Sequence, residues 1–157
     1  MYILDSVLPI LSEQIDNFRI NIVGSGAKSL VGTRDSLSQR FVSFEEFVPD
    51  INALFNSMDL ALFPVLHGGG IKTKIIEAMA AGLPVVTTPH GIDGLENLPQ
   101  GSIGLAKSPS GFAREIIRLI DDYSLRTRRS LAARAYVDNE HSFPVFSFKI
   151  KRIYSCM

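Results

Sequence analysis

Short apolar runs alternate with segments of helical spacing along the chain. The apolar runs stand between turn-forming residues and predict strands over 18–23, 40–44, 59–65, 84–88 and 102–106. Helical spacing, or in one case a run rich in Arg and Ala, predicts helices over 4–15, 51–55, 71–81, 112–123, 125–139 and 146–154. Because the strands are apolar on both faces and alternate with helices, the pattern predicts an α/β fold in which helices cover both sides of a parallel sheet.

Residues at the ends of the predicted elements refine this arrangement. Asp50 is placed to cap the helix that follows it, and Gly82 to end the helix that precedes it. The chain opens on a helix, whereas most doubly wound folds begin with a strand that becomes central in the sheet. We therefore expect a Rossmann-like, doubly wound sheet whose usual first strand is absent or lies upstream of Met1.

Composition and charge narrow the class of protein. The 157 residues show no repeat, low-complexity tract or linker, so we expect a single domain over 1–157. The 16 Lys and Arg balance the 16 Asp and Glu, so no net field favours nucleic acid as a partner. No apolar run approaches ~18 residues, and Met1–Asp5 does not resemble a signal peptide. The lone Cys156 can form neither an internal disulfide nor a metal cluster, and a cytoplasmic protein is expected.

Three consecutive glycines, Gly68–Gly70, stand between an apolar strand and a strongly predicted helix. Backbone N–H groups at the start of a helix have no intrahelical partner, and the helix dipole favours an anion there. Glycines also let a phosphate approach the backbone without a clash with a Cβ atom. The pattern therefore indicates a phosphate site at the start of this helix.

The helix after the glycines separates two kinds of side chain. At about 100° per residue, one face carries Ile71, Ile75 and Met79, and another carries Thr73, Lys74 and Glu77. A diphosphate at the glycines would leave a ribose within reach of Glu77, whose two oxygens can accept hydrogen bonds from paired hydroxyls. The same residues are equally compatible with a solvated helix face on which Lys74 and Glu77 form an ion pair.

The stretch from Gly68 to Pro84 resembles the donor-site signature of family 4 retaining glycosyltransferases and their relatives with the GT-B fold. In that signature a glycine-rich loop opens a helix with the pattern K-x-x-E-A-M-A-x-G-x-P-V-V-x-T. The residues that match it in order are Lys74, Glu77, Ala78, Met79, Ala80, Gly82, Pro84, Val85, Val86 and Thr88. Residues 23–26, 63–64 and 91–95 also resemble the family, so the likeness extends over nearly the whole chain.

The resemblance implies a function as well as a fold. It implies the donor-binding, C-terminal half of a GT-B glycosyltransferase, which moves a sugar from a nucleoside diphosphate to an acceptor hydroxyl with retained configuration. An enzyme of this kind is expected to act in the synthesis of a cell-surface polysaccharide or glycolipid. Its substrate would be a sugar nucleotide.

The resemblance also implies roles for single residues. Glu77 would bind the ribose hydroxyls, and the backbone amides of Gly69, Gly70 and Ile71 would hold the diphosphate or the sugar. The full set of residues implied to contact or border the donor is Gly24, Gly26, Val48, Gly68, Gly69, Gly70, Ile71, Lys74 and Glu77. The helix dipole and cationic side chains would neutralise the diphosphate, so no metal or other cofactor is expected.

Three features depart from the family pattern. Gly69 stands eight positions before Glu77, where many members carry an acidic residue that contacts the donor sugar. The family's basic pair, which stabilises the leaving diphosphate, would precede this chain, and Lys72 or Lys74 are the candidates to replace it. The acceptor-binding N-terminal domain is expected to be missing as well. We therefore expect the chain to need that domain, or a second copy of itself, as a partner.

Other functions remain open from the sequence alone. The departures also fit a non-catalytic remnant, or a nucleotide-binding module without transferase activity. A sugar-nucleotide epimerase would share the fold, but the pattern from Lys74 to Ala80 favours a transferase. Gly24–Ser29 nearly spells the G-x-G-x-x-G fingerprint of a dinucleotide site, with Glu45 and Glu46 about 20 residues further on, but its last glycine is replaced by Ser29.

Side chains outside these motifs carry weaker signals. His67 and His90 flank the predicted cleft and His141 lies in a polar turn, and three scattered histidines do not make a metal site. A predicted helix carries four arginines that fit either a solvated face or contact with the inner face of an anionic membrane, namely Arg126, Arg128, Arg129 and Arg134. Exposed apolar surface, which usually marks a missing partner, is expected at Phe143, Phe146 and Phe148.

Overall fold

The computed structural model describes residues 2–27, 29–30 and 36–155. Lys28 and Cys156 lie outside these residues, so the expectations that involve them are not tested. All five predicted strands are present, as β1 Ile20–Val23, β2 Val42–Glu45, β3 Ala61–Phe63, β4 Val85–Thr87 and β5 Gly104–Leu105. Each strand is shorter than predicted because the flanking residues already turn into loops or helices. Every pairing between these strands is parallel, which confirms the predicted α/β class.

The helices also follow the prediction, with shifted ends. They are η1 Tyr2–Val7, α1 Leu8–Ser12, α2 Ser36–Phe41, α3 Ile51–Asn56, α4 Thr73–Ala80, η3 Pro89–Ile92, α5 Pro109–Asp121, α6 Tyr123–Glu140 and α7 Phe143–Ser155. Phe41, which was predicted to lie in a strand, instead ends α2. The sequence predicts that Tyr123 ends the helix over 112–123, but Tyr123 is the first residue of α6. The reason is that the Asp122 side chain caps α6, accepting a hydrogen bond from the Leu125 amide at 2.8 Å.

The signals for a helix start and a helix end are confirmed at two places. The side chain of Asp50 accepts hydrogen bonds from the amides of Asn52 (2.9 Å) and Ala53 (3.0 Å), and so caps α3. Gly82 follows the end of α4, and its amide donates to the Met79 carbonyl at 3.0 Å. Both boundaries depend on residues within a few positions of each other, which explains why the sequence was sufficient to predict them.

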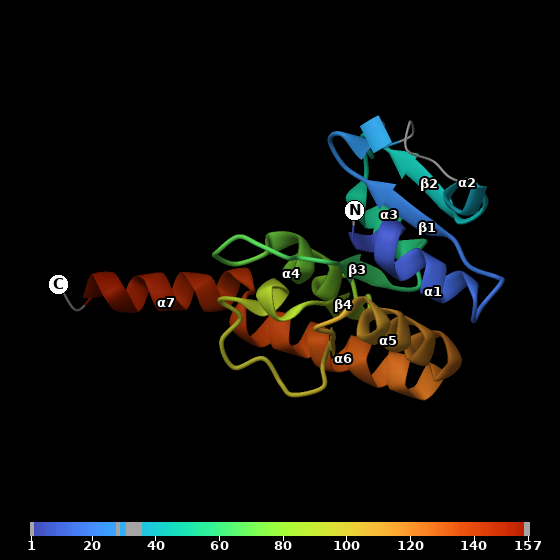
Figure 1. Ribbon diagram of the computed structural model, residues 1–157. Coiled ribbons are helices and arrows are strands. Elements are labelled where there is room, and N and C mark those ends of the chain that lie inside the picture. Colours follow the sequence, from blue (N-terminus) through green and yellow to red (C-terminus); the bar gives the residue numbers. More distant parts are fainter. Residues whose placement is uncertain (1, 28, 31–35, 156–157) are drawn as a thin grey trace.

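The strands form two sheets instead of the one that the pattern predicts. β1 pairs with β2, while β3, β4 and β5 form a second sheet in that order. Figure 1 shows the first pair set apart from the strands of the second sheet. No strand precedes β1 in the described part of the chain, and no ladder there joins β1 to β3. In a doubly wound fold of order 3-2-1-4-5-6, the first strand stands at this position. The sheet is therefore divided where the usual first strand would lie.

Helices cover the strands from two sides, and buried apolar side chains of the helices and strands form two clusters. Phe112 of α5 lies in one cluster, together with Leu8 of α1. Met79 of α4 lies in the other. Adjacent residues of β4 face opposite sides, so Val86 belongs to the first cluster and Val85 to the second. All five of these side chains are fully buried, so β4 is covered on both faces, as predicted.

The last helix, α7, extends away from the rest of the molecule (Figure 1). The side chains of Phe143, Phe146 and Phe148 are exposed as predicted, and that of Tyr154 is exposed as well. An apolar surface of this kind on a projecting helix is typical of a contact with another protein or domain. Neither α7 nor any other helix in the described ranges combines the length and apolarity needed to cross a membrane.

The arginines of α6 do not share one surface. Arg129 is only 7% exposed, and its Nη1 lies 2.6 Å from Oε2 of Glu115 on α5. The guanidinium of Arg126 lies over the ring of Tyr123, 5.4 Å from the ring centroid. The prediction of a four-arginine face is therefore wrong for Arg129, because this side chain joins two helices and does not face the solvent.

Candidate functional site

The glycine-rich loop connects the carboxyl end of β3 to α4, as the sequence predicts. Gly68 and Gly70 have φ angles of +100° and +76°, a region that other residues rarely adopt. A Cβ atom built on any of Gly68, Gly69 or Gly70 would meet nothing within 4 Å. Backbone conformation, and not crowding, therefore requires glycine at Gly68 and Gly70. The surface of the loop is open to a ligand.

Lys72 occupies one side of this loop. Its ammonium group donates hydrogen bonds to the carbonyl oxygens of Gly68 (3.1 Å), Gly69 (3.2 Å) and Gly70 (2.6 Å). In a trans peptide the carbonyl and the following N–H point in opposite directions. Because the three carbonyls converge on Lys72, the N–H groups of Gly69, Gly70 and Ile71 face the other side of the loop. Lys72 thus positions the loop, a role that the sequence did not indicate.

The helix α4 begins two residues later than predicted. Its buried face contains Ile75 and Met79, which are both fully buried. Ile71 was predicted to share that face, but it lies before the helix and is 50% exposed. The prediction fails there because Lys72, the N-cap of α4, has non-helical backbone angles, so the helical spacing does not extend back to Ile71.

Glu77 lies on the outer face of α4, about one helical turn after its start. Its Oε2 accepts a hydrogen bond from the Lys74 ammonium at 3.0 Å, and the two side chains are 42% and 66% exposed. The ion pair of a solvated helix face is therefore present. An exposed ion pair of this kind contributes at most about 1 kcal/mol to stability, so a ligand can break it at little cost. Because both side chains are also exposed, Lys74 and Glu77 are accessible to a ligand at the glycine-rich loop.

The other residues of the predicted donor site lie on loops that follow β1 and β2. Gly24 and Gly26 form the turn after β1, and the Gly24 amide donates to the Glu45 carbonyl at the end of β2, at 2.9 Å. Val48 lies in the loop after β2 and is half-buried. These residues gather at the carboxyl end of the first sheet. A cleft between β1 and β3 separates that sheet from the strand that leads to the glycine-rich loop.

The turn after β1 does not have the form of a dinucleotide site. A dinucleotide fingerprint requires an α-helix to begin at its glycines. Here residues 27, 29 and 30 have 3₁₀ and not α-helical geometry, and the next described helix is α2, Ser36–Phe41. The structure therefore disfavours the dinucleotide alternative.

Two buried threonines hold the strand that enters the glycine-rich loop. Thr87 of β4 donates a hydrogen bond through Oγ1 to the Phe63 carbonyl at 2.6 Å, and the Thr88 hydroxyl donates to the Val65 carbonyl. Both contacts fix the end of β3 and the residues that follow it. Thr88 belongs to the matched signature, whereas Thr87 carries no signal in the sequence and acquires this role through the pairing of β3 with β4.

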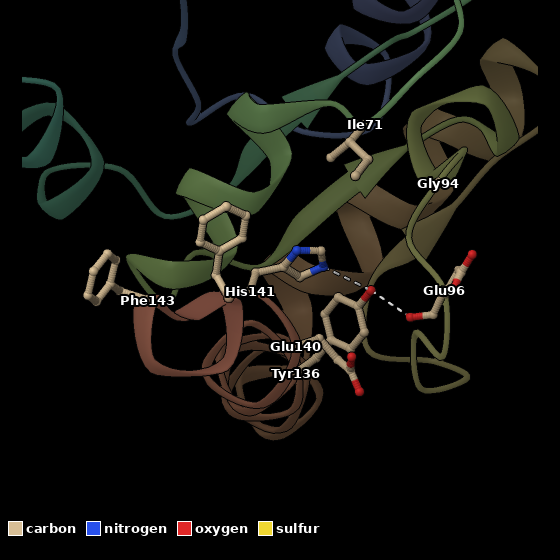
Figure 2. A pocket seen from close by; sticks show the side chains of 8 residues that line it. Ile71, Gly94, Glu96, Tyr136, Glu140, His141 and Phe143 are labelled. Atoms are coloured by element: carbon tan, nitrogen blue, oxygen red, sulfur yellow. Dashed lines mark hydrogen bonds between the residues drawn. The ribbon is translucent and has the colours of Figure 1, made fainter. Parts of the chain in front are cut away.

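A second hollow, with a volume of about 550 Å³, lies beside Ile71 (Figure 2). Within it the Tyr136 hydroxyl donates to the Glu96 carbonyl at 2.7 Å and lies 3.2 Å from Nε2 of His141. Burial, and then the nearby carboxylates of Glu140 and Glu96, raise the pKa of Tyr136. The sequence predicts that His141 lies in a polar turn without a chemical role. The structure instead pairs it with a tyrosine of α6.

The remaining histidines are dispersed. His67 lines the cleft between β1 and β3, and His90 pairs with Asp93 at the surface, 3.3 Å away. Within residues 2–27, 29–30 and 36–155, no three His, Cys, Asp or Glu side chains gather as the ligands of a metal ion would. The polar groups that converge on one surface are therefore those of the glycine-rich loop and α4.

Known proteins resemble the chain in sequence. Residues 1–122 match the family model of group 1 glycosyl transferases. The chain is 31% identical to the capsular polysaccharide biosynthesis glycosyltransferase CapM of Staphylococcus aureus, over 69% of this chain and 29% of CapM. It is 28% identical to the phosphatidyl-myo-inositol mannosyltransferase of Mycobacterium leprae, over 98% of this chain and 42% of that enzyme. The chain thus spans less than half the length of these relatives.

Solved structures share the fold. HepE from Anabaena, crystallised with UDP, superimposes with a TM-score of 0.82 at 22% identity, over 99% of this chain and 46% of HepE. The C-terminal domain of a group 1 glycosyl transferase, LpcC from Francisella tularensis, gives a TM-score of 0.73 at 17% identity, over 88% of this chain and 77% of that domain.

Proposed function

Since the chain belongs to the group 1 glycosyltransferases, we propose that it binds the nucleoside-diphosphate sugar that serves as donor in their reaction. Its fold is the Rossmann-like, C-terminal half of a GT-B enzyme. HepE has been crystallised with UDP and with UDP-glucose, which supports a sugar nucleotide as the ligand of this chain. We further propose that the described residues form a single donor-binding domain.

The geometry of the glycine-rich loop carries this proposal. Its carbonyls face Lys72, so the N–H groups of Gly69, Gly70 and Ile71 point away from that side chain, next to the start of α4. Successive backbone N–H groups at a helix start make a site for phosphate oxygens. The diphosphate of the donor is the part of the substrate that these groups fit.

The side chains of α4 complete the proposed site. Glu77 accepts hydrogen bonds from the ribose hydroxyls. Lys72 is already bound to three carbonyls, so Lys74 is the better candidate to neutralise the diphosphate. During transfer the bond between the sugar and the diphosphate breaks. The negative charge then grows on the diphosphate, where the loop amides and the α4 dipole stabilise it without a metal ion.

The acceptor is proposed from the relatives. CapM is a capsular polysaccharide glycosyltransferase, and the Mycobacterium leprae enzyme is a phosphatidyl-myo-inositol mannosyltransferase. A cell-surface polysaccharide or glycolipid is therefore the proposed product. Sugar transfer requires the acceptor to be held in line with the donor, and we propose that a further domain or partner supplies that part of the enzyme.

Replacement of Glu77 tests the donor site. In Glu77→Ala the ribose loses its acceptor, so UDP is expected to bind about 1–3 kcal/mol more weakly, a roughly 5- to 150-fold rise in Kd. Isothermal titration calorimetry with UDP and GDP measures this change. Glu13→Ala, an exposed carboxylate after α1, is the matched control and should bind as the unmodified chain does. If no nucleotide binds at millimolar concentration, the donor site is refuted and a remnant without nucleotide binding is favoured.

Replacement of Lys72 tests the shape of the loop. Lys72→Met keeps most of the side-chain length but leaves three carbonyls without their donor, so the loop loses the contacts that hold its conformation. We expect roughly tenfold weaker UDP binding, together with faster amide hydrogen exchange at Gly69 and Gly70. Lys107→Met, at an exposed lysine after β5, should change neither quantity. Weaker binding without faster exchange would mean that Lys72 acts on the ligand directly and not through the loop.

A further inference from the structure

A hollow lined by arginines, the arginine pocket, lies between α5, α6 and the loop that precedes β5. Its volume is about 490 Å³, within the range of about 300–1,000 Å³ that is typical of sites for small molecules. Arg118, Arg128 and Arg129 belong to its lining, and no Asp or Glu of the described residues does. The pocket therefore presents positive charge without an acidic side chain on its surface.

Helical spacing brings these side chains together. Arg128 and Arg129 follow Leu125 by one helical turn and precede Ala132 by another, so the four residues share one face of α6. Leu125 is buried, and the small side chain of Ala132 leaves room above this face. The helix α5 packs beside α6 (Figure 1) and contributes Arg118. Arginines of two helices thus converge on one hollow.

The arginines of the pocket outnumber their acidic partners. Glu115 of α5 pairs with two of them, because its Oε2 lies 2.6 Å from Nη1 of Arg129 and its Oε1 lies 3.4 Å from Nη1 of Arg118. Arg128 is exposed and forms no ion pair within the described part of the chain. Three guanidinium groups therefore share one carboxylate, which lies outside the lining. The excess of positive charge favours an anionic ligand.

The chemistry of the lining favours a phosphate group among anions. A guanidinium group donates two parallel hydrogen bonds to phosphate or carboxylate oxygens. A phosphomonoester carries about 1.5 to 2 negative charges at pH 7 and has three acceptor oxygens, so it matches the excess charge better than a carboxylate does. Arg118 and Arg128 lie on different helices and are both exposed, so they can bind different oxygens of one phosphate. Arg129 is only 7% exposed and forms the back of the pocket.

The arginine pocket lies away from the glycine-rich loop. Gly101 and Ser102 line the pocket and precede β5, whereas Gly68–Gly70 follow β3. Because β3, β4 and β5 are parallel, residues before β5 and residues after β3 lie at opposite ends of the sheet. Ligands of open α/β sheets usually bind at the carboxyl ends of the strands. The arginine pocket is at the amino end, so it is separate from the proposed donor site.

We propose that the arginine pocket is a second anion site, which binds the phosphate group of a small soluble phosphomonoester or of a phosphatidic acid headgroup. Arg118 and Arg128 donate hydrogen bonds to the phosphate oxygens, and Arg129 adds its positive charge from behind them. The Glu115 carboxylate holds Arg118 and Arg129 in place. This proposal does not rest on the binding of a sugar nucleotide.

Titration of the whole chain with inorganic phosphate, followed by proton–nitrogen correlation NMR, tests the proposal. The backbone amides of Gly101 and Ser102 and the Nε–H groups of the arginines should shift in a saturable way. We expect a Kd of about 1 mM or lower at low ionic strength. Acetate at the same ionic strength should shift these signals less, because it carries a single charge. The phosphate shifts should persist when UDP is present, because the two sites lie at opposite ends of the sheet.

Variants of α6 show whether the phosphate enters the arginine pocket. Arg128→Gln removes a charged donor and should weaken phosphate binding by at least about tenfold. Arg134→Gln is the matched control, since Arg134 is exposed on the same helix but outside the lining, and it should change binding less than about twofold. Ala132→Glu keeps every arginine but adds a carboxylate to the pocket, and it should abolish saturable binding. Circular dichroism checks that each variant folds.

A second comparison identifies the molecule that carries the phosphate. Glycerol 3-phosphate represents a soluble phosphomonoester, and phosphatidylcholine vesicles with and without phosphatidic acid represent a membrane. Shifts with glycerol 3-phosphate and no cosedimentation with either vesicle would assign a soluble ligand. Cosedimentation only with vesicles that contain phosphatidic acid, lost in Arg128→Gln, would assign a lipid headgroup. Either result supports an anion site in the arginine pocket.

Three results would overturn the proposal. The first is no saturable shift at Gly101 and Ser102 at millimolar phosphate. The second is equal weakening of phosphate binding by Arg128→Gln and Arg134→Gln, which would assign the effect to overall charge. The third is a set of shifts confined to residues 69–71 and removed by UDP, which would place the phosphate at the donor loop alone. Failure of UDP to bind contradicts only the donor site and leaves the arginine pocket unaffected.

Discussion

Replacing Phe112 with alanine is expected to lower the free energy of unfolding by about 3–5 kcal/mol. The side chain is fully buried where α5 packs against the N-terminal helices, and its ring meets that of Tyr2 edge-on, with 5.7 Å between the centroids. Alanine would remove this contact and leave a cavity beneath η1, which also lines the cleft between β1 and β3. Urea unfolding followed by far-UV circular dichroism measures the change, since the chain contains no Trp.

The control for this variant lies on the same helix. Ile120 of α5 is 36% exposed, so Ile120→Ala should alter the free energy of unfolding by less than about 1 kcal/mol. Equal losses for Phe112→Ala and Ile120→Ala would contradict the packing of α5 against η1. A large loss only for Phe112→Ala would establish that this contact stabilises one wall of the cleft.

Replacing Arg129 with alanine is expected to destabilise the chain by about 2–3 kcal/mol, the cost of losing a hydrogen bond to a charged group. The guanidinium is buried against Glu115, whose side chain is only 16% exposed. The variant would remove the nearer partner of this carboxylate and leave only Arg118, whose exposed guanidinium lies 3.4 Å from Oε1. The pair also rests on β5. A Cβ atom at Gly104 would lie 3.1 Å from Nη1 of Arg129 and 3.1 Å from Oε2 of Glu115. The ion pair thus fills the space between α5, α6 and the edge of the second sheet.

A double variant separates the loss of the pair from the burial of a lone charge. Glu115→Gln combined with Arg129→Met should lose less stability than Arg129→Ala, because no uncompensated charge remains. Arg128→Ala, at an exposed position of α6, should stay within about 0.5 kcal/mol of the unmodified chain. If Arg129→Ala behaves as Arg128→Ala does, Arg129 belongs to the solvated face that the sequence predicted.

Local patterns were sufficient for the elements of the fold because each depends on neighbouring residues. Asp50 caps α3 through amides two and three positions away, and Ile75 and Met79 share a face because they lie one turn apart. The same spacing placed Glu77 on the outer face of α4. The run of glycines between β3 and α4 is itself sufficient to predict a loop there, and Gly68 and Gly70 have positive φ angles.

Local sequence patterns could not predict contacts between segments that are distant along the chain. Nothing in a run of arginines marks Arg129 as buried, because its partner Glu115 lies on the preceding helix. The interaction of Lys72 with three carbonyls depends on how the loop folds back. Thr87 and His141 acquire their partners through strand pairing and through the end of α6, and neither stands out in the sequence.

The sequence alone determined the α/β class, the order of strands and helices, and the likeness of the Gly68–Pro84 stretch to a donor site. It also indicated that the usual first strand is not among these residues. Only the tertiary structure decided that the described strands divide into two sheets, because β1 pairs with β2 and β3 with β4, and a cleft lies between the two pairs. Pairing between strands is set by hydrogen bonds across the sheet, which the local periodicity of a single chain segment does not contain.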